Sequence, residues 1–397
     1  MKRILSFALL LLAAPVLHAR EINPDGVYFR KNSGTAQKLT RLKLGVFSSL
    51  GAWMADNDVA FHGWLSRNML FYVKELESAD TFIIYTANAL TRARTEIYRS
   101  RGIPLLARST PDGKHIVIKR VIKQEPFASE LLVIGTDGRV RNAISGTSVL
   151  PDFTISPDNQ LLIERERGIT AHDPKSGREE LIVPRAHYAA FRRPGGSVLA
   201  YLSPRTSRIA LLSGAAGDYA LGILNRGRTE RVITTATSAT EAGWLDENTL
   251  AFRTGAPGAF SVSLLNAATG AVTRLPGESL NTSLTISPVI RRIGYSIDGT
   301  GGIYDMTTGR YTLLPVEGDE LLFASSDIFA MLYAKRLFVL NYPSLLSRSH
   351  AWKSVMDGVI AQYEEAAKVR PDWDSDWTGE YIRRKIATLR KIHREVP

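Results

Sequence analysis

The sequence of 397 residues contains no cysteine. The protein therefore forms no disulfide bond, and it carries no lipid on an N-terminal cysteine. Small exported domains commonly depend on disulfides, whereas a chain of this length buries enough apolar surface to fold without them. The lack of cysteine is thus compatible with export, provided that the folded domain is large.

Long hydrophobic runs are lacking beyond the N-terminus. The longest apolar stretch, Leu321 to Leu340, is interrupted by Asp327, Lys335 and Arg336. Burying this stretch in lipid would leave those charges without water. We interpret it as β-strands, and we expect no transmembrane segment in the mature chain.

The N-terminus has the pattern of a secretory signal peptide. Lys2 and Arg3 precede an apolar run from Ile4 to Leu12, and small and polar residues follow up to Ala19. The run is too short for a membrane-spanning helix. We predict a signal peptide over residues 1–19, with cleavage after Ala19 and an uncleaved anchor as the alternative, and hence a periplasmic or secreted protein.

Motifs for metal binding are missing. The mature chain contains neither HExxH nor a close pair of histidines, which makes a zinc site unexpected. The acidic run Asp372 to Asp376 resembles the opening of a calcium loop. However, Trp377 stands where that loop needs glycine, and Arg383 stands where it needs glutamate. We interpret these acids as stabilising the start of a helix through its dipole.

Motifs for catalysis and cofactor binding are also lacking. There is no Gly-x-Ser-x-Gly motif, and only about fifty residues follow the last repeat described below, which is too few for a hydrolase domain. The glycine motifs that bind phosphate are absent. Quinone-binding propellers normally add a tryptophan after their repeated turn, and leucines occupy those positions here. We therefore predict no catalytic residue, no metal and no cofactor, although a hydrolase or lactonase with a metal in a propeller channel stays an alternative.

Positive charge is in excess. The formal net charge is +11, or +9 once Lys2 and Arg3 are removed with the signal peptide. Outside the cytoplasm, a basic surface meets anionic lipid, acidic glycans or acidic proteins before it meets nucleic acid. A solvated surface without a specific role is the simplest alternative.

The middle of the chain repeats two turns with a period of roughly 40 to 50 residues, which is typical of propeller blades. The first is a turn before an apolar strand, in which proline fixes φ and Asp, Asn or Gly accepts the angles that follow. Its best copies are 109–113 before His115 to Ile118 and 156–159 before Leu161 to Ile163. Weaker copies are 193–196 before Val198, 245–248 before Leu250 and 287–288 before Ile293.

The second repeated turn closes an outer hairpin. A polar residue starts the turn, and a glycine supplies the positive φ that lets the next strand pair back. Five copies follow copies of the first turn, at residues 136–138, 173–177, 225–227, 266–270 and 305–309. This regular order predicts radial repetition of one small sheet.

The paired turns, Ser-x-Pro-Asp-Gly and then Asp-x-x-Thr-Gly, resemble the repeat of TolB-like and WD-type β-propellers over residues 100 to 317. TolB proteins carry an α/β domain ahead of the propeller, and too little sequence precedes the first repeat here. The resemblance therefore covers the propeller only, and it implies that the mouth of the propeller binds envelope proteins.

The remaining segments complete an all-β propeller. Asp58 to Tyr98 contains strands typical of a blade, and Leu321 to Tyr342 offers about three strands, while Val27 to Leu42 could supply the missing outer strand of the last blade. We predict about seven four-stranded blades, with six as the alternative, over residues 20–345.

The apolar pattern becomes helical after Pro343. Residues Trp352 to Ala367 follow the i, i+3, i+4, i+7 rule, and a second stripe runs from Trp377 to Leu389. We predict a C-terminal helical extension over residues 346–397 that packs on the propeller, with docking to a partner as the alternative. The candidate interaction surface is the basic side of the second helix, which carries Arg383, Arg384, Lys385, Arg390, Lys391 and Arg394.

Together these features favour an exported, non-catalytic β-propeller that acts as a protein-binding scaffold in the cell envelope. Fold analogy is its main support, and propellers host many functions. Binding of anionic lipid or glycan through the basic C-terminal helix is a further alternative.

Overall fold

The computed structural model describes residues 33–76, 80–124, 127–146, 152–189, 191–192, 196–205, 208–215, 218–225, 236–237, 242–256, 259–276, 284–287, 291–297, 300–317, 320–324, 327–333, 335–341, 349–368 and 376–395. The predicted signal peptide and the acidic run up to residue 375 lie outside these residues. No described helix is both long enough and apolar enough to cross a bilayer.

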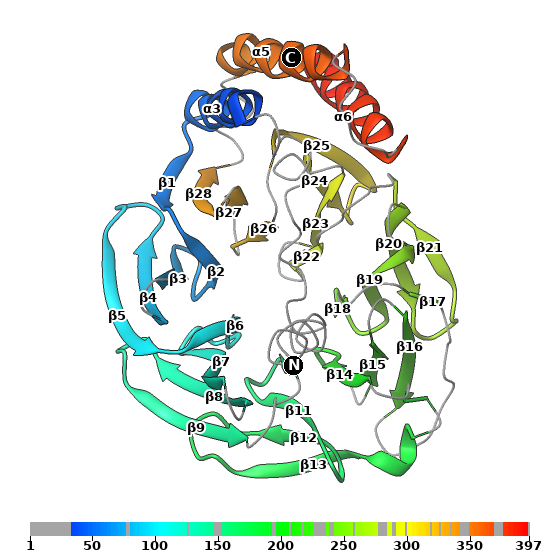
Figure 1. Ribbon diagram of the computed structural model, residues 1–397. Coiled ribbons are helices and arrows are strands. Elements are labelled where there is room, and N and C mark those ends of the chain that lie inside the picture. The colour runs from blue at the N-terminus through cyan, green and yellow to red at the C-terminus, as the bar shows by residue number, and fades with distance from the viewer. Residues whose placement is uncertain are drawn as a thin grey trace, which may run out of the picture. The chain divides into compact units, whose positions relative to one another are not determined.

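The fold is a β-propeller of seven four-stranded blades, as the repeated turns predict (Figure 1). The chain divides into two compact units. Five blades belong mainly to the first unit, which contains residues 58–256 and 263–275, and two blades with three long helices belong to the second.

The first three blades have their strands in chain order, from the inner strand outwards. Blade 1 contains β2 (Val59–Trp64), β3 (Met69–Leu76), β4 (Thr81–Asn88) and β5 (Arg94–Arg101). Blade 2 contains β6 (Ile103–Ser109), β7 (His115–Gln124), β8 (Phe127–Gly135) and β9 (Val140–Gly146). Blade 3 contains β10 (Phe153–Ile155), β11 (Leu161–Arg165), β12 (Gly168–His172) and β13 (Glu179–Pro184), and η2 (Arg185–His187) follows it.

Blades 4 and 5 form one continuous sheet, because β17 pairs with β19 through Thr237 and Gly255. Blade 4 contains β14 (Ser197–Leu202), β15 (Arg208–Ala215), β16 (Asp218–Asn225) and β17 (Ala236–Thr237). Blade 5 contains β18 (Ala242–Trp244), β19 (Thr249–Ala256), β20 (Ala259–Asn266) and β21 (Val272–Arg274).

Blade 7 takes its outer strand from the N-terminal part of the chain. Blade 6 contains β22 (Leu284–Ser287), β23 (Arg292–Ile297), β24 (Thr300–Asp305) and β25 (Arg310–Glu317). Blade 7 contains β26 (Glu320–Phe323), β27 (Ile328–Tyr333) and β28 (Arg336–Asn341), and β1 (Trp53–Asp56) pairs antiparallel with β28 (Figure 1). A strand from residues 27–42 was expected at this place, and that expectation is wrong, because the described part of that range belongs to helix α3 (Ser33–Ser49).

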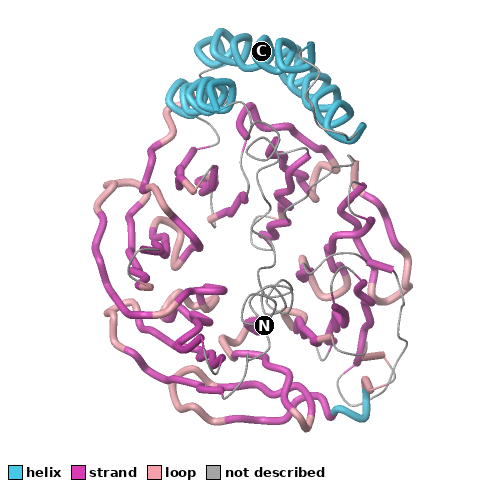
Figure 2. Tube along the Cα trace, in the orientation of Figure 1, coloured by secondary structure: helices cyan, strands magenta, loops and turns pink. Residues whose placement is uncertain are grey.

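Three helices lie together on the outside of blades 6 and 7 (Figure 2). Helix α3 packs beside α5 (Ser349–Lys368), which packs beside α6 (Asp376–Glu395). Phe47 of α3 stacks on Phe338 of β28, with 4.1 Å between the ring centroids. The C-terminal helices thus pack on the propeller, and their buried residues form one core with strands β24 to β28.

The side chains of each central strand point alternately to the two faces of its sheet, and they pack against both neighbouring blades. On β7, Ile116 and Ile118 pack against blade 1, whereas Val117 packs against Phe153 and Leu161 of blade 3. Because successive side chains point to opposite faces of a sheet, each central strand contributes to two interblade cores.

The second repeated turn behaves as predicted in the four copies that the structure describes. In the turn at 173–177, the Asp173 carboxylate accepts hydrogen bonds from the backbone N–H groups of Lys175 and Ser176, at 2.7 and 2.9 Å. Gly138 has φ +79°, and a Cβ atom at this glycine would collide with the carbonyl oxygen of Ile97 in blade 1. Glycine is therefore needed there both for the backbone angle and for close approach of the two blades.

The copy of the first turn in blade 4 was wrongly placed. Residues 193–196 precede β14, the inner strand, instead of the second strand. The turn between β14 and β15 begins at Ser203 and Pro204, so these residues occupy the position of the repeat. The apolar run from Val198 to Tyr201 forms a strand, as predicted, and this strand is the first of its blade.

Candidate interaction surface

The described residues contain no group of three or more His, Asp or Glu side chains that could hold a metal ion. Burial lowers the pKa of His62 to about 3. It also lowers the pKa of His115 and His172, each of which has a charged neighbour as well. These histidines are neutral at neutral pH, and they lie apart from one another on β2, β7 and β12.

The basic side of α6 is smaller than the sequence predicts. Lys385 is fully buried, with its ammonium 3.3 Å from the Thr300 hydroxyl, so it does not belong to an exposed surface. Arg384 donates to Glu380 at 2.5 Å, and Arg390 donates to Glu364 of α5 at 2.6 Å. Arg383, Lys391 and Arg394 are exposed.

The apolar side of α6 is part of the protein core. Tyr381, Ile382, Leu389 and Ile392 are buried against blades 6 and 7, together with Met356 to Tyr363 of α5. The helix is thus packed against the core through its apolar side, and the ion pair of Arg390 with Glu364 joins it to α5. Its exposed cations lie on a helix that belongs to the folded domain.

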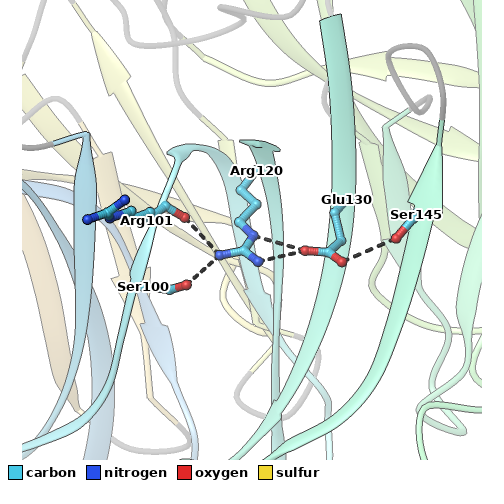
Figure 3. A network of polar contacts seen from close by, with 5 residues as sticks. All are labelled: Ser100, Arg101, Arg120, Glu130 and Ser145. Carbon is cyan, nitrogen blue, oxygen red and sulfur yellow. Dashed lines mark hydrogen bonds and ion pairs between the residues drawn. The ribbon is translucent and has the colours of Figure 1, made fainter. Parts of the chain in front are cut away.

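Blades 1 and 2 are joined by a polar clamp at the ends of their outer strands (Figure 3). Arg120 donates two hydrogen bonds to the Glu130 carboxylate, at 3.0 and 2.7 Å, and two more to the Ser100 hydroxyl and the Arg101 carbonyl, at 2.5 and 2.8 Å. Ser145 donates to the other oxygen of Glu130 at 3.2 Å. Arg120 is thus saturated by partners from two blades and serves the fold.

A second polar group lies at the opposite ends of the blade 2 strands, facing blade 3. His115 begins β7 directly after the turn at 109–114, and its side chain shares the face of Val117, which packs against blade 3. The residue is only 5% exposed, and among the described residues Nδ1 of its imidazole has no hydrogen-bond partner. A buried polar atom without a partner is uncommon and costs free energy.

Three cations lie close enough to His115 to affect its pKa. Burial is the main cause of the lowered pKa of His115, Asp112 opposes it, and Lys175, Arg141 and Lys114 each lower the pKa further. Lys114 adjoins the imidazole in sequence, Arg141 lies on the outer strand of the same blade, and Lys175 lies on a turn of blade 3. We call Lys114, His115, Arg141 and Lys175 the His115 cluster.

The outer strands of both blades also carry exposed aliphatic side chains, and exposed basic residues lie near them in the sequence. Val140 on β9 is 44% exposed, and Leu181 on β13 is 38% exposed. Arg139 and Arg178 beside them are exposed as well. We call Arg139, Val140, Arg178 and Leu181 the rim. Sequence reasoning missed both groups, since each joins residues from turns about 40 positions apart, and the only local signal was the basic residue beside each turn.

Comparisons with known proteins support the fold. No protein-family model and no curated protein matches the sequence. Among solved structures, hydrazine synthase of Kuenenia stuttgartiensis is 13% identical over 72% of this chain and 96% of its own, with a TM-score of 0.53. Oligogalacturonate lyase in complex with manganese is 11% identical over 72% and 91%, with a TM-score of 0.51.

TolB from Acinetobacter baumannii is also among the similar structures, at 14% identity over 68% of this chain and 79% of its own, with a TM-score of 0.39. At these identities the similarity concerns architecture and not activity. The predicted propeller fold is confirmed, and the chain folds as a seven-bladed β-propeller.

Proposed function

We propose that the protein is an exported, non-catalytic scaffold that binds another protein in the cell envelope through the rim and the His115 cluster. One observation carries the proposal. Two exposed aliphatic side chains, Val140 and Leu181, lie among cations on the outer strands of neighbouring blades. Such a mixture offers a protein partner both apolar contact area and positive charge.

Its composition supports this function. Arginine is enriched at protein interfaces, and exposed apolar side chains contribute the contact area that a partner covers. Arg139 and Arg178 have no ion-pair partner among the described residues. Their charges remain available, so they would attract an acidic partner and favour its correct orientation.

Export is supported by the sequence pattern. The basic start and short apolar run at residues 1–19 are typical of a signal peptide, and the cysteine-free chain depends on no oxidising compartment. A periplasmic or secreted location would bring the basic surface into contact with acidic envelope proteins.

Photo-crosslinking in the envelope tests this function. A photoreactive phenylalanine analogue replaces Val140, and the matched control carries it at Val272 of blade 5, which is 45% exposed. We expect one discrete adduct from position 140 and none from position 272. The same set of adducts from both positions, or no adduct from position 140, would count against the proposal.

Binding of anionic lipid or glycan by α6 is a second candidate, because Arg383, Lys391 and Arg394 are exposed on that helix. Deleting the helix is a poor test, since it would uncover the core around Tyr381 and Leu389. Charge reversal at Arg383 and Arg394 leaves that core intact. If this surface binds lipid, the reversal removes salt-sensitive binding to vesicles that contain phosphatidylglycerol.

A further inference from the structure

The His115 cluster has the chemistry of an oxyanion site built from two blades. His115 lies opposite Gly135 in the β7–β8 pairing. Directly opposed residues have their Cβ positions about 5 Å apart, on the same face of the sheet. Gly135 has no side chain, and the Asp137 carboxylate and the Arg141 guanidinium occupy this space, with Oδ1 2.5 Å and Nε 2.9 Å from the ideal Cβ position. The ion pair of Asp137 and Arg141 thus lies on the same side of the sheet as the imidazole.

Arg141 is directed there by an irregularity in the outer strand. The pairing of β8 with β9 shifts between Val133 and Ile134, so that Arg141 is the extra residue between Val140 and Asn142. Such a bulge re-aims the side chain of the inserted residue. Asp137 then holds the guanidinium at 2.5 Å through Nη2. The arginine is therefore oriented before any ligand binds.

Lys175 reaches the same place from blade 3. Its turn is fixed by Asp173, and an ideal Cβ on Gly177 would lie 3.1 Å from the Asn142 amide of blade 2. The turn of blade 3 is thus in close contact with β9 of blade 2. A further bond supports the arrangement, since the backbone N–H of Asp112 donates to the Asn159 side chain of blade 3 at 2.8 Å.

The nearby carboxylates already have partners. Asp112 accepts from the Thr110 hydroxyl at 2.6 Å and from the backbone N–H of Lys114 at 3.1 Å. Asp137 and Asp173 accept from backbone N–H groups of their own turns. Among the described residues, the ammonium groups of Lys114 and Lys175 form no ion pair. Two unpaired ammonium groups and an oriented guanidinium therefore surround a buried imidazole.

The geometry points to a carboxylate of an acidic protein segment as the ligand of the His115 cluster. This inference rests on the proposed protein-binding function and names the group that anchors the partner. The exposed side chains of Val140 and Leu181 favour a peptide over a simple anion as the ligand. A segment in which acidic and apolar residues are mixed can contact both the cations and these aliphatic side chains. A free phosphate ion would leave them uncovered.

Histidine NMR on the mature chain tests this assignment. The imidazole signals are recorded with ¹³C-labelled histidine, and His115→Gln identifies the signal of His115. The probe is a ten-residue peptide of alternating glutamate and leucine, and inorganic phosphate and phosphatidylglycerol vesicles are tested separately. We expect the peptide to move the His115 signal saturably and to raise the pKa of this histidine, because a bound anion favours the imidazolium.

Two variants measure the contribution of the cluster. Arg141→Gln and Lys175→Gln each remove one charged contact, and each should weaken peptide binding by about tenfold. Arg92→Gln is the matched control, since Arg92 is an exposed arginine on the corresponding turn of blade 1. It should bind as the wild type does. Equal melting temperatures for all variants would establish that they are folded.

Several results would overturn the assignment. One is a His115 signal that stays in place while the peptide binds, and another is wild-type affinity in the Arg141 and Lys175 variants. A shift caused by phosphate or vesicles but not by the peptide would reject the peptide carboxylate as ligand. Crosslinking from position 140 distinguishes this inference from the proposed function. If adducts persist in a variant that carries both Arg141→Gln and Lys175→Gln, the proposed function stands and this inference fails.

Discussion

His62 should make the folded protein sensitive to acid. This histidine is buried on β2, and burial lowers its pKa to about 3, against an ordinary value of 6.5. The folded state therefore keeps the imidazole neutral at pH values where the unfolded chain takes up a proton. Because the unfolded state then binds more protons, the free energy of unfolding falls as the pH drops below 6.5.

The size of the effect at pH 5 can be worked out. One pH unit below the unfolded pKa corresponds to about 1.4 kcal/mol for one group, so 1.5 units give about 2 kcal/mol. At pH 5 the folded state binds almost no proton at this imidazole, since pH 5 lies well above the folded pKa. Burial also lowers the pKa of His115 and His172, and their contributions add to the same trend in any variant of His62.

Comparing the wild type with His62→Gln isolates this one group. Unfolding by urea is followed by tryptophan fluorescence and circular dichroism at pH 7.5 and pH 5, and coincident transitions are required before free energies are extracted. The wild type should lose about 2 kcal/mol more than the variant between the two pH values. His187→Gln is the control, since His187 is exposed. Equal losses in the wild type and His62→Gln would refute the reasoning.

Three further predictions concern the blades and helices, and each is measured as a change in the free energy of unfolding. Gly138→Ala should lower the free energy of unfolding by at least about 2 kcal/mol, because of the positive φ and the collision of the new Cβ with blade 1. Gly379→Ala on α6 should raise it by up to about 1 kcal/mol, because nothing lies within 4 Å of the new Cβ. Arg120→Ala should cost about 3 kcal/mol, because four hydrogen bonds are lost, two of them to blade 1 and two to Glu130 within blade 2, and a loss below 0.5 kcal/mol would contradict the clamp. Asp152→Asn should cost about 3 kcal/mol by removing the negative charge that lies 2.7 Å from the buried ammonium of Lys119, and adding Lys119→Met should recover most of that loss.

The blades were predictable because local chemistry marks them. A turn such as 173–177 depends on its own Asp and Gly, whatever the rest of the chain does. Residues 193–196 resemble the repeated turn but are not a copy of it, because proline and glycine also occur in connections between blades. The authentic turn at Ser203 and Pro204 lacks the Asp-Gly pair, so composition alone favoured the wrong place.

Helix α3 escaped prediction for a different reason. Leu39, Val46 and Leu50 follow helical spacing, but Lys43 falls on the buried side of the helix and interrupts the apolar stripe. The structure accommodates this lysine by a 2.7 Å hydrogen bond to the Tyr363 hydroxyl of α5. No local sequence pattern predicts a hydrogen-bond partner that lies 320 residues away in the chain. The His115 cluster was hidden in the same way, since the register between blades decides which turn residues meet.

The pairing of β1 with β28 has a consequence for the order of synthesis. Met54 leaves the ribosome early, and its partner Phe338 follows only after all the blades between them have been translated. Until then β1 has an unpaired backbone edge that could recruit the wrong neighbour. A contact of such long sequence separation also forms slowly, because the intervening chain must first be brought together. Final closure of the last blade should therefore be a late event in folding, and the nascent chain would profit from a chaperone that covers this edge in the interval.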